Sequence, residues 1–216
     1  MKQILLFAMA LISFPLFGRD SKEALFWKWF QKNEDTVFHF EKDRERVFDQ
    51  LGKALQAVNP DLTFEFGPVT SDGKREFVIS AGGIKSAFPA VEAVAHSAPR
   101  LPRWIILKYR QRRNPINDLE YGGKKVRSAE VKYLLFRDDK PGKVGVMVFI
   151  PGYTEAERPT YGQIGYLFLD EALGEYDVEM RVGAIVFAGQ DSKYFPQGHA
   201  LSDLGADFDR YFASQK

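Results

Sequence analysis

Hydrophobic side chains recur every three to four residues over two stretches near the start of the chain, which predicts two amphipathic helices. Asp20 and Ser21 precede Glu23, an arrangement typical of a capped helix start, and the apolar positions that follow are Leu25, Phe26, Trp29 and Phe30. A second helix is predicted over about 42–58, with one apolar face and a strongly charged beginning. An Asn-Pro pair at 59–60 ends it.

The period then changes to two, which predicts strands. Apolar residues alternate with polar ones over 62–66, a Ser-Asp-Gly turn follows at 71–73, and 77–79 is a continuous apolar run, so we expect a hairpin. Two glycines at 82–83 lead into a helix predicted over about 86–98, with Pro89 in its first turn. The next strand is predicted at 104–107.

The second half of the chain repeats this order after a long connection. Residues 110–125 contain an Asn-Pro pair, a Gly-Gly pair and few aliphatic side chains, with room for a short strand at 119–121. The pattern beyond predicts strands at 131–136, 144–150 and 182–187, a helix at 160–173, and a last helix from Leu201 with Ser202 as its N-cap.

Both halves therefore have the order strand, strand, helix, strand, over about 61–109 and 130–188. At a fixed offset of 70 residues, four pairs match: Phe66 with Phe136, Val78 with Val148, Gly82 with Gly152, and Pro89 with Pro159. An internal duplication is one explanation. The other is that any hairpin followed by a helix produces such matches.

These elements predict an α+β protein, with a mainly antiparallel sheet covered on one face by helices and further helices at both ends. We expect residues 19–216 to form a single domain, because each half alone would leave an apolar sheet face uncovered.

The first 18 residues resemble an export signal. One lysine at position 2 is followed by a mostly apolar run over 4–17, which is shorter than the roughly 20 residues that a membrane-spanning helix needs. Cleavage is expected near Gly18, which would leave a periplasmic or secreted protein without a transmembrane span. The alternatives are an uncleaved N-terminal anchor and a buried first helix.

Composition narrows the chemistry. The chain of 216 residues has no cysteine, which excludes disulfides, thiolate metal sites and cysteine nucleophiles. Its 30 basic and 29 acidic residues give a net charge of +1, which argues against a dedicated nucleic-acid-binding protein. The three histidines, His39, His96 and His199, lack the spacing of a metal site, so no metal and no cofactor are expected.

Candidate catalytic residues lie in two loops. The connection 151–161 carries Glu155, Glu157 and Tyr161, which would support acid–base chemistry if they line a cleft. His199 follows a loop rich in turn-forming residues, where functional side chains are common. Solvated carboxylates and a structural histidine are the simpler interpretation of both.

A basic cluster surrounds the strand predicted at 104–107. Its members, with one aromatic residue among them, are Arg103, Trp104, Lys108, Arg110, Arg112 and Arg113. One hypothesis is a surface that binds an anionic ligand or a protein, with Trp104 as a flat contact. In the alternatives, the charges protect an edge strand, with Lys108, Arg110 and Arg112 on one face, or pair internally with the acidic residues over 170–179.

The segment Phe26-Trp27-Lys28-Trp29-Phe30-Gln31-Lys32-Asn33-Glu34, with 62–66 and 75–81 downstream, resembles a family of bacterial hypothetical proteins. The resemblance covers most of the chain beyond residue 25. It implies no activity and assigns no catalytic residue.

The sequence thus favours an exported bacterial protein that acts by binding a protein or an anionic ligand, without catalysis of its own. The rival hypothesis is a periplasmic hydrolase that uses the loop carboxylates and tyrosines. A third is structural pairing with another protein through the helix that carries Trp27 and Trp29.

Overall fold

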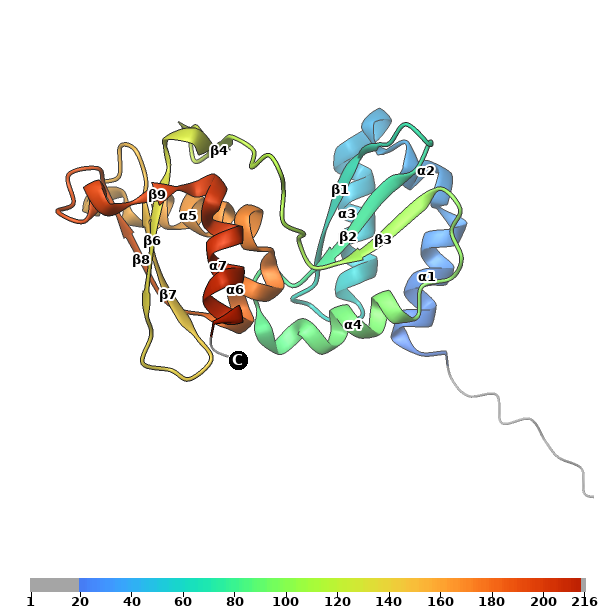
Figure 1. The fold of residues 1–216 in the computed structure, drawn as a ribbon. Coiled ribbons are helices and arrows are strands. Elements are labelled where there is room, and N and C mark those ends of the chain that lie inside the picture. Colours follow the sequence, from blue (N-terminus) through green and yellow to red (C-terminus); the bar gives the residue numbers. More distant parts are fainter. Residues whose placement is uncertain (1–19, 215–216) are drawn as a thin grey trace, which may run out of the picture.

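A computed structural model describes residues 20–214 of the chain (Figure 1). The predicted signal segment 1–18 therefore lies outside the described residues. Within the described part, no helix combines the length and the apolar character needed to cross a membrane.

The first half contains the predicted elements and one short helix that the sequence pattern did not predict, at Glu34–Phe38, and it builds a three-stranded sheet. In chain order they are α1 (Lys22–Lys32), α2 (Glu34–Phe38), α3 (Arg44–Gln56), β1 (Thr63–Val69), β2 (Arg75–Ser80), α4 (Phe88–His96) and β3 (Trp104–Lys108). The strand order is β1-β2-β3: β1 and β2 form an antiparallel hairpin, and the chain crosses through α4 to place β3 parallel to β2. Local signals set the boundaries, since Ser21 caps α1 by accepting a hydrogen bond from the Ala24 N–H.

Aromatic side chains fill the core of this half. Phe77 of β2 is fully buried, and its ring lies 5.1 Å from that of Phe30 and 5.4 Å from that of Phe66, measured between centroids. Trp27 of α1 is buried in the same cluster and donates its indole N–H to the Val94 carbonyl of α4 at 2.8 Å. The helices are thus held to the sheet by ring packing and by one buried hydrogen bond.

The second half has its own sheet and its own core. A small hairpin, β4 (Leu119–Tyr121) and β5 (Lys124–Val126), precedes β6 (Lys132–Arg137), β7 (Val144–Phe149), α5 (Arg158–Leu173), α6 (Glu175–Arg181), β8 (Val182–Ala188), β9 (His199–Ala200) and α7 (Leu204–Ala213). The larger sheet has the order β8-β7-β6-β9, with β7 antiparallel to β6 and parallel to β8. Helices α5, α6 and α7 lie on one side of it (Figure 1).

The α+β class is confirmed, with one difference in the sheets. The strands are divided among three sheets instead of joining in one. In each half, the chain forms an antiparallel pair of strands, then a helical connection, and then a strand parallel to the second of the pair. This is the predicted order of elements. The duplication itself stays a prediction. The last helix begins at Leu204 with Asp203 as its N-cap, instead of Ser202, because 201–203 form a short 3-10 turn first.

A buried carboxylate joins the two halves. Glu175, at the start of α6, is fully buried and accepts hydrogen bonds from the backbone N–H groups of Ala81 at 3.0 Å, Gly83 at 3.1 Å and Arg110 at 3.1 Å. The first two donors belong to the loop after β2. Nearby, the Arg110 guanidinium contacts Glu65 of β1 and Asp170 of α5, so charged side chains of both halves meet at one arginine.

Asp170 makes this junction sensitive to pH. Burial raises the pKa of Asp170 to about 6, and Arg110 offsets only part of the effect. The folded state therefore takes up a proton at a higher pH than the unfolded chain, so this group stabilises the fold as the pH falls through about 6. Between pH 7 and pH 4.5 we expect the free energy of unfolding of wild type to rise relative to that of Asp170→Asn by about 2 kcal/mol.

Urea denaturation of both proteins at several pH values measures this difference. Asp139→Asn, which alters an exposed aspartate, is the matched control. A constant difference between wild type and Asp170→Asn across the range would contradict the prediction.

Candidate ligand-binding site

The connection between the halves forms one wall of an open cavity beside α7. After β3 the chain turns at Tyr109, which has a positive φ of 61° and a buried ring. It then follows α5, where the Arg113 N–H donates to the Glu171 carbonyl at 2.7 Å and Arg112 Nε donates to the Leu173 carbonyl at 2.9 Å. These bonds fix the connection against the second half.

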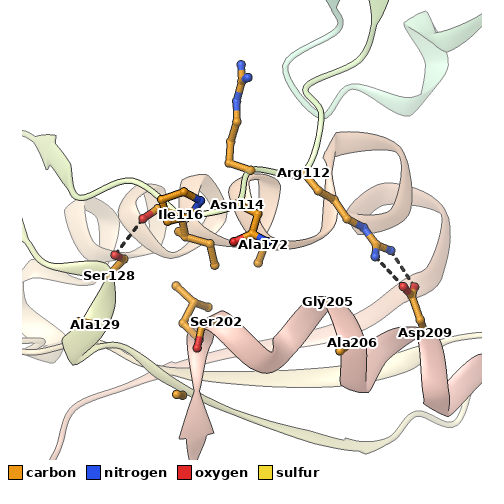
Figure 2. Close-up of a pocket in the computed structure, with 14 residues that line it drawn as sticks. Arg112, Asn114, Ile116, Ser128, Ala129, Ala172, Ser202, Gly205, Ala206 and Asp209 are labelled. Atoms are coloured by element: carbon orange, nitrogen blue, oxygen red, sulfur yellow. Dashed lines mark hydrogen bonds and ion pairs between the residues drawn. The ribbon is translucent and has the colours of Figure 1, made fainter.

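The cavity opens between this connection and the start of α7, and its volume is about 500 Å³ (Figure 2). Most lining residues are small or apolar, and they come from four separate segments: Arg112, Arg113, Asn114, Pro115, Ile116, Ser128, Ala129, Ala172, Ala200, Leu201, Ser202, Gly205, Ala206 and Asp209. This volume lies within the range of about 300–1,000 Å³ that is common for small-molecule sites.

Few polar groups of the cavity are left for a ligand. Ser128 donates its hydroxyl to the Ile116 carbonyl at 3.0 Å, which stabilises one wall. In Figure 2, Asn114 lies on one side of the cavity and Ser202 on the other. Asn114 is exposed, and its side-chain amide has no hydrogen-bond partner among residues 20–214. It is therefore available to donate to, and accept from, a bound molecule.

Two of the charged residues at the cavity, Arg112 and Asp209, bond to each other. Arg112 donates to both carboxylate oxygens of Asp209, at 2.9 and 3.0 Å, and also to Asp177 at 2.8 Å. The hydrogen bonds that Arg112 donates to Asp209 raise the pKa of Arg112, so the guanidinium stays charged. A bidentate pair of this kind is rigid. It shapes the cavity wall and offers neither a general base nor a nucleophile.

The predicted loop residues lie outside this cavity. Glu155 and Glu157 occupy a short 3-10 turn, and Tyr161 is buried in the first turns of α5. Glu155 accepts a hydrogen bond from the Tyr153 hydroxyl at 3.0 Å, and Glu157 forms an ion pair with Lys124 at 2.7 Å. Lys124 lowers the pKa of Glu157, which suits a structural ion pair better than a general acid.

His199 lies on a different element from those carboxylates. It is in β9, where its exposed ring is 5.9 Å from that of Tyr133 and its Nδ1 is 3.9 Å from Asp207. Over 20–214, no cluster of three or more histidine or carboxylate side chains is placed to hold a metal ion. The structure thus groups Glu155, Glu157 and Tyr161 on one segment and leaves His199 apart from them.

Two expectations about the basic cluster are wrong. Trp104 is only 5% exposed, because it packs among the aromatic rings of the first core, so it is not a flat surface contact. Lys108, Arg110 and Arg112 do not share a strand face, because β3 ends at Lys108 and the chain turns at Tyr109.

Internal pairing, predicted as an alternative for the cluster, is confirmed. Arg110 pairs with Asp170 at 3.0 Å and Arg112 with Asp177 at 2.8 Å, both within the acidic run. The remaining members also have acidic partners: Arg103 contacts Glu34 and Asp35, Lys108 contacts Glu92, and Arg113 contacts Glu76. The cluster therefore serves largely to hold elements together.

Sequence patterns located only part of the cavity. Arg112 and Arg113 were predicted binding residues, and both line the cavity. The prediction, however, was that these arginines bind an anionic ligand directly. Ile116, Ala129 and Ala206 belong to no sequence motif. The one available signal was the Asn-Pro pair at 114–115, which the pattern assigns to a connection and which forms the cavity wall.

Comparison with known proteins adds no relative: no family model, no curated protein and no solved structure matches this chain.

Proposed function

We propose that this protein acts by binding a small, largely apolar molecule, or a short apolar peptide segment, in the 500 Å³ cavity beside the connection. The observation that carries the proposal is a cavity of ligand size, with mostly small and apolar walls and an unpaired amide at Asn114. Sites with apolar walls and few polar groups are typical of ligand binding.

The paired charges favour binding over catalysis. Arg112 and Asp209 bond to each other, and the loop carboxylates proposed for a hydrolase lie outside the cavity. A strongly anionic ligand fits less well than an apolar one, because the arginines of the basic cluster already have acidic partners.

A dye titration tests the proposal directly. Ala206 lines the cavity from α7 and its side chain is exposed, so Ala206→Phe should fill the cavity without disturbing the core. We expect the neutral dye N-phenyl-1-naphthylamine to bind the wild type saturably, with a fluorescence increase, and to bind Ala206→Phe at least about tenfold more weakly. Such a loss corresponds to about 1.4 kcal/mol.

Ala213→Phe is the matched control, because Ala213 is also exposed and lies in the same helix outside the cavity. It should bind the dye as the wild type does. Equal binding by both variants, or no saturable binding by the wild type, would overturn the proposal.

We also propose that the chain is exported, from the charged start and the short apolar run over 2–17. N-terminal sequencing of the protein from a periplasmic or culture fraction should begin close to Arg19. A protein that retains Met1 would contradict cleavage.

A further inference from the structure

Strand β8 forms an outer edge of the four-stranded sheet, and its sequence carries no protection against pairing. It bonds to β7 on one side only. Its seven residues, VGAIVFA, include no charged residue and no proline. An exposed apolar edge strand presents a row of free backbone groups to another strand.

The other sheet edges each have a feature that discourages pairing. β1 contains Pro68 and an irregular register between Phe66 and Val69. β3 has only five residues, follows Arg103 and ends in Lys108. On the far edge of the larger sheet, β9 pairs with Lys132 and Tyr133 of β6, and the uncovered part of β6 ends in the charged Arg137. Among these edges of the two larger sheets, β8 is therefore the one without such a feature.

The hydrogen-bond pattern shows which groups of β8 are free. The Ile150 N–H donates to the Ala188 carbonyl, so Ala188 bonds toward β7. The backbone N–H and C=O groups of successive residues alternate in direction along a strand. Those of Val186 therefore also bond toward β7, whereas the backbone groups of Ile185 and Phe187 point away from it. At the beginning of β8, the carboxylate of Asp138 accepts from the Ala184 N–H. The open edge thus comprises Ile185 to Ala188.

Side-chain positions complete the picture. Ile185 packs into the core beneath the helices, as does Phe187. Val186 therefore faces the opposite side of the sheet, where it is 39% exposed. The register places it beside Met147 of β7, and Met147 beside Leu134 of β6, so an apolar row crosses this face and ends at the open edge.

We propose that β8 is a homodimer interface, in which β8 of a second copy pairs antiparallel with it about a two-fold axis at Val186. This arrangement sets Ile185 of each copy opposite Phe187 of the other, so that the outward backbone groups bond in pairs. The two Val186 side chains become direct neighbours at a position without hydrogen bonds. The result is a continuous eight-stranded sheet.

A second copy fits this edge for two reasons. A two-fold axis brings like residues together, which repels where they are charged and is favourable where they are apolar, as along β8. The net charge of the whole chain is only +1, so long-range repulsion between copies is small. The apolar row ending at Val186 also continues into the corresponding row of the second copy.

The absence of cysteine allows a specific test. At a non-hydrogen-bonded antiparallel position the Cα atoms are about 4.5 Å apart, which a disulfide can span. Val186→Cys should therefore form a disulfide-linked dimer with oxidised glutathione at least about tenfold faster than Val69→Cys, because pairing raises the effective thiol concentration. Val69 is the matched control, an exposed valine on β1.

Charge substitutions give a second, independent readout by native mass spectrometry. Val186→Lys and Val186→Glu should each be largely monomeric under conditions in which the wild type is a dimer, and an equimolar mixture should form the heterodimer. Equal crosslinking rates for the two cysteine variants, or a monomeric wild type, would overturn the proposal. Because Val186 lies outside the cavity, these variants should bind the dye normally, which separates this test from that of the proposed function.

Discussion

Replacing Glu175 by alanine is expected to destabilise the protein by about 3–5 kcal/mol and to uncouple its two halves. The carboxylate is fully buried and accepts from the N–H groups of Ala81, Gly83 and Arg110. Its removal leaves one buried donor, the Ala81 N–H, and two partly buried donors without their acceptor. A buried unsatisfied donor costs about 1–3 kcal/mol before relaxation. The same bonds join the loop after β2 to α6, so the halves lose a main connection.

The distribution of tryptophan makes this uncoupling measurable. All three tryptophans, Trp27, Trp29 and Trp104, lie in the first half, so their fluorescence follows that half alone, whereas far-ultraviolet circular dichroism follows both. In urea, the two signals should give coincident transitions for the wild type, in which Glu175 couples the halves, and separate transitions for Glu175→Ala.

Glu155→Ala is the control, because that side chain is exposed and its hydrogen bond to Tyr153 lies at the surface. It should change the stability by less than about 1 kcal/mol. Coincident transitions in Glu175→Ala with a similarly small loss would show that this carboxylate does not join the halves.

Phe77→Ala should lower the free energy of unfolding by about 3–5 kcal/mol, mainly in the first half. The ring is 0% exposed and sits among those of Phe26, Trp27, Phe30, Phe64, Phe66 and Trp104. Truncation to alanine removes the free energy gained by burying the Phe77 ring and leaves a cavity. The neighbouring rings are held by α1, β1 and β3, so they cannot all move inward to fill it.

Chemical denaturation followed by tryptophan fluorescence measures this loss. Tyr194→Ala, which truncates an exposed aromatic ring, should cost less than about 1 kcal/mol. A loss below about 2 kcal/mol for Phe77→Ala would mean that the first core repacks around the gap.

The elements that sequence predicted are those fixed by local signals. Alternation over 62–66 and 77–79 marked a hairpin, and Ser21 marked the start of α1, because these features depend on neighbours in the chain. The division into three sheets was not visible, since periodicity shows which side of a strand is buried but not which strands pair.

The candidate site was harder to predict because distant contacts determine it. The roles of Arg110 and Arg112 follow from acidic partners about 60 residues away, and charge pattern alone did not decide between surface binding, protection of an edge strand and internal pairing. The burial of Trp104 was also not predicted, because its neighbours in the sequence are charged whereas its partners in the aromatic core are distant in the chain. Small cavity-lining residues such as Ala206 have no chemical signature at all.

Native mass spectrometry of the mature chain, isolated without refolding, tests ligand binding in the cavity most directly. We expect a reproducible small-molecule adduct on the wild type that is retained by Ala213→Phe and lost from Ala206→Phe, because only the second ring fills the cavity. An adduct of the same mass and abundance on all three proteins, or bare protein in every case, would contradict the assignment of this cavity as the binding site.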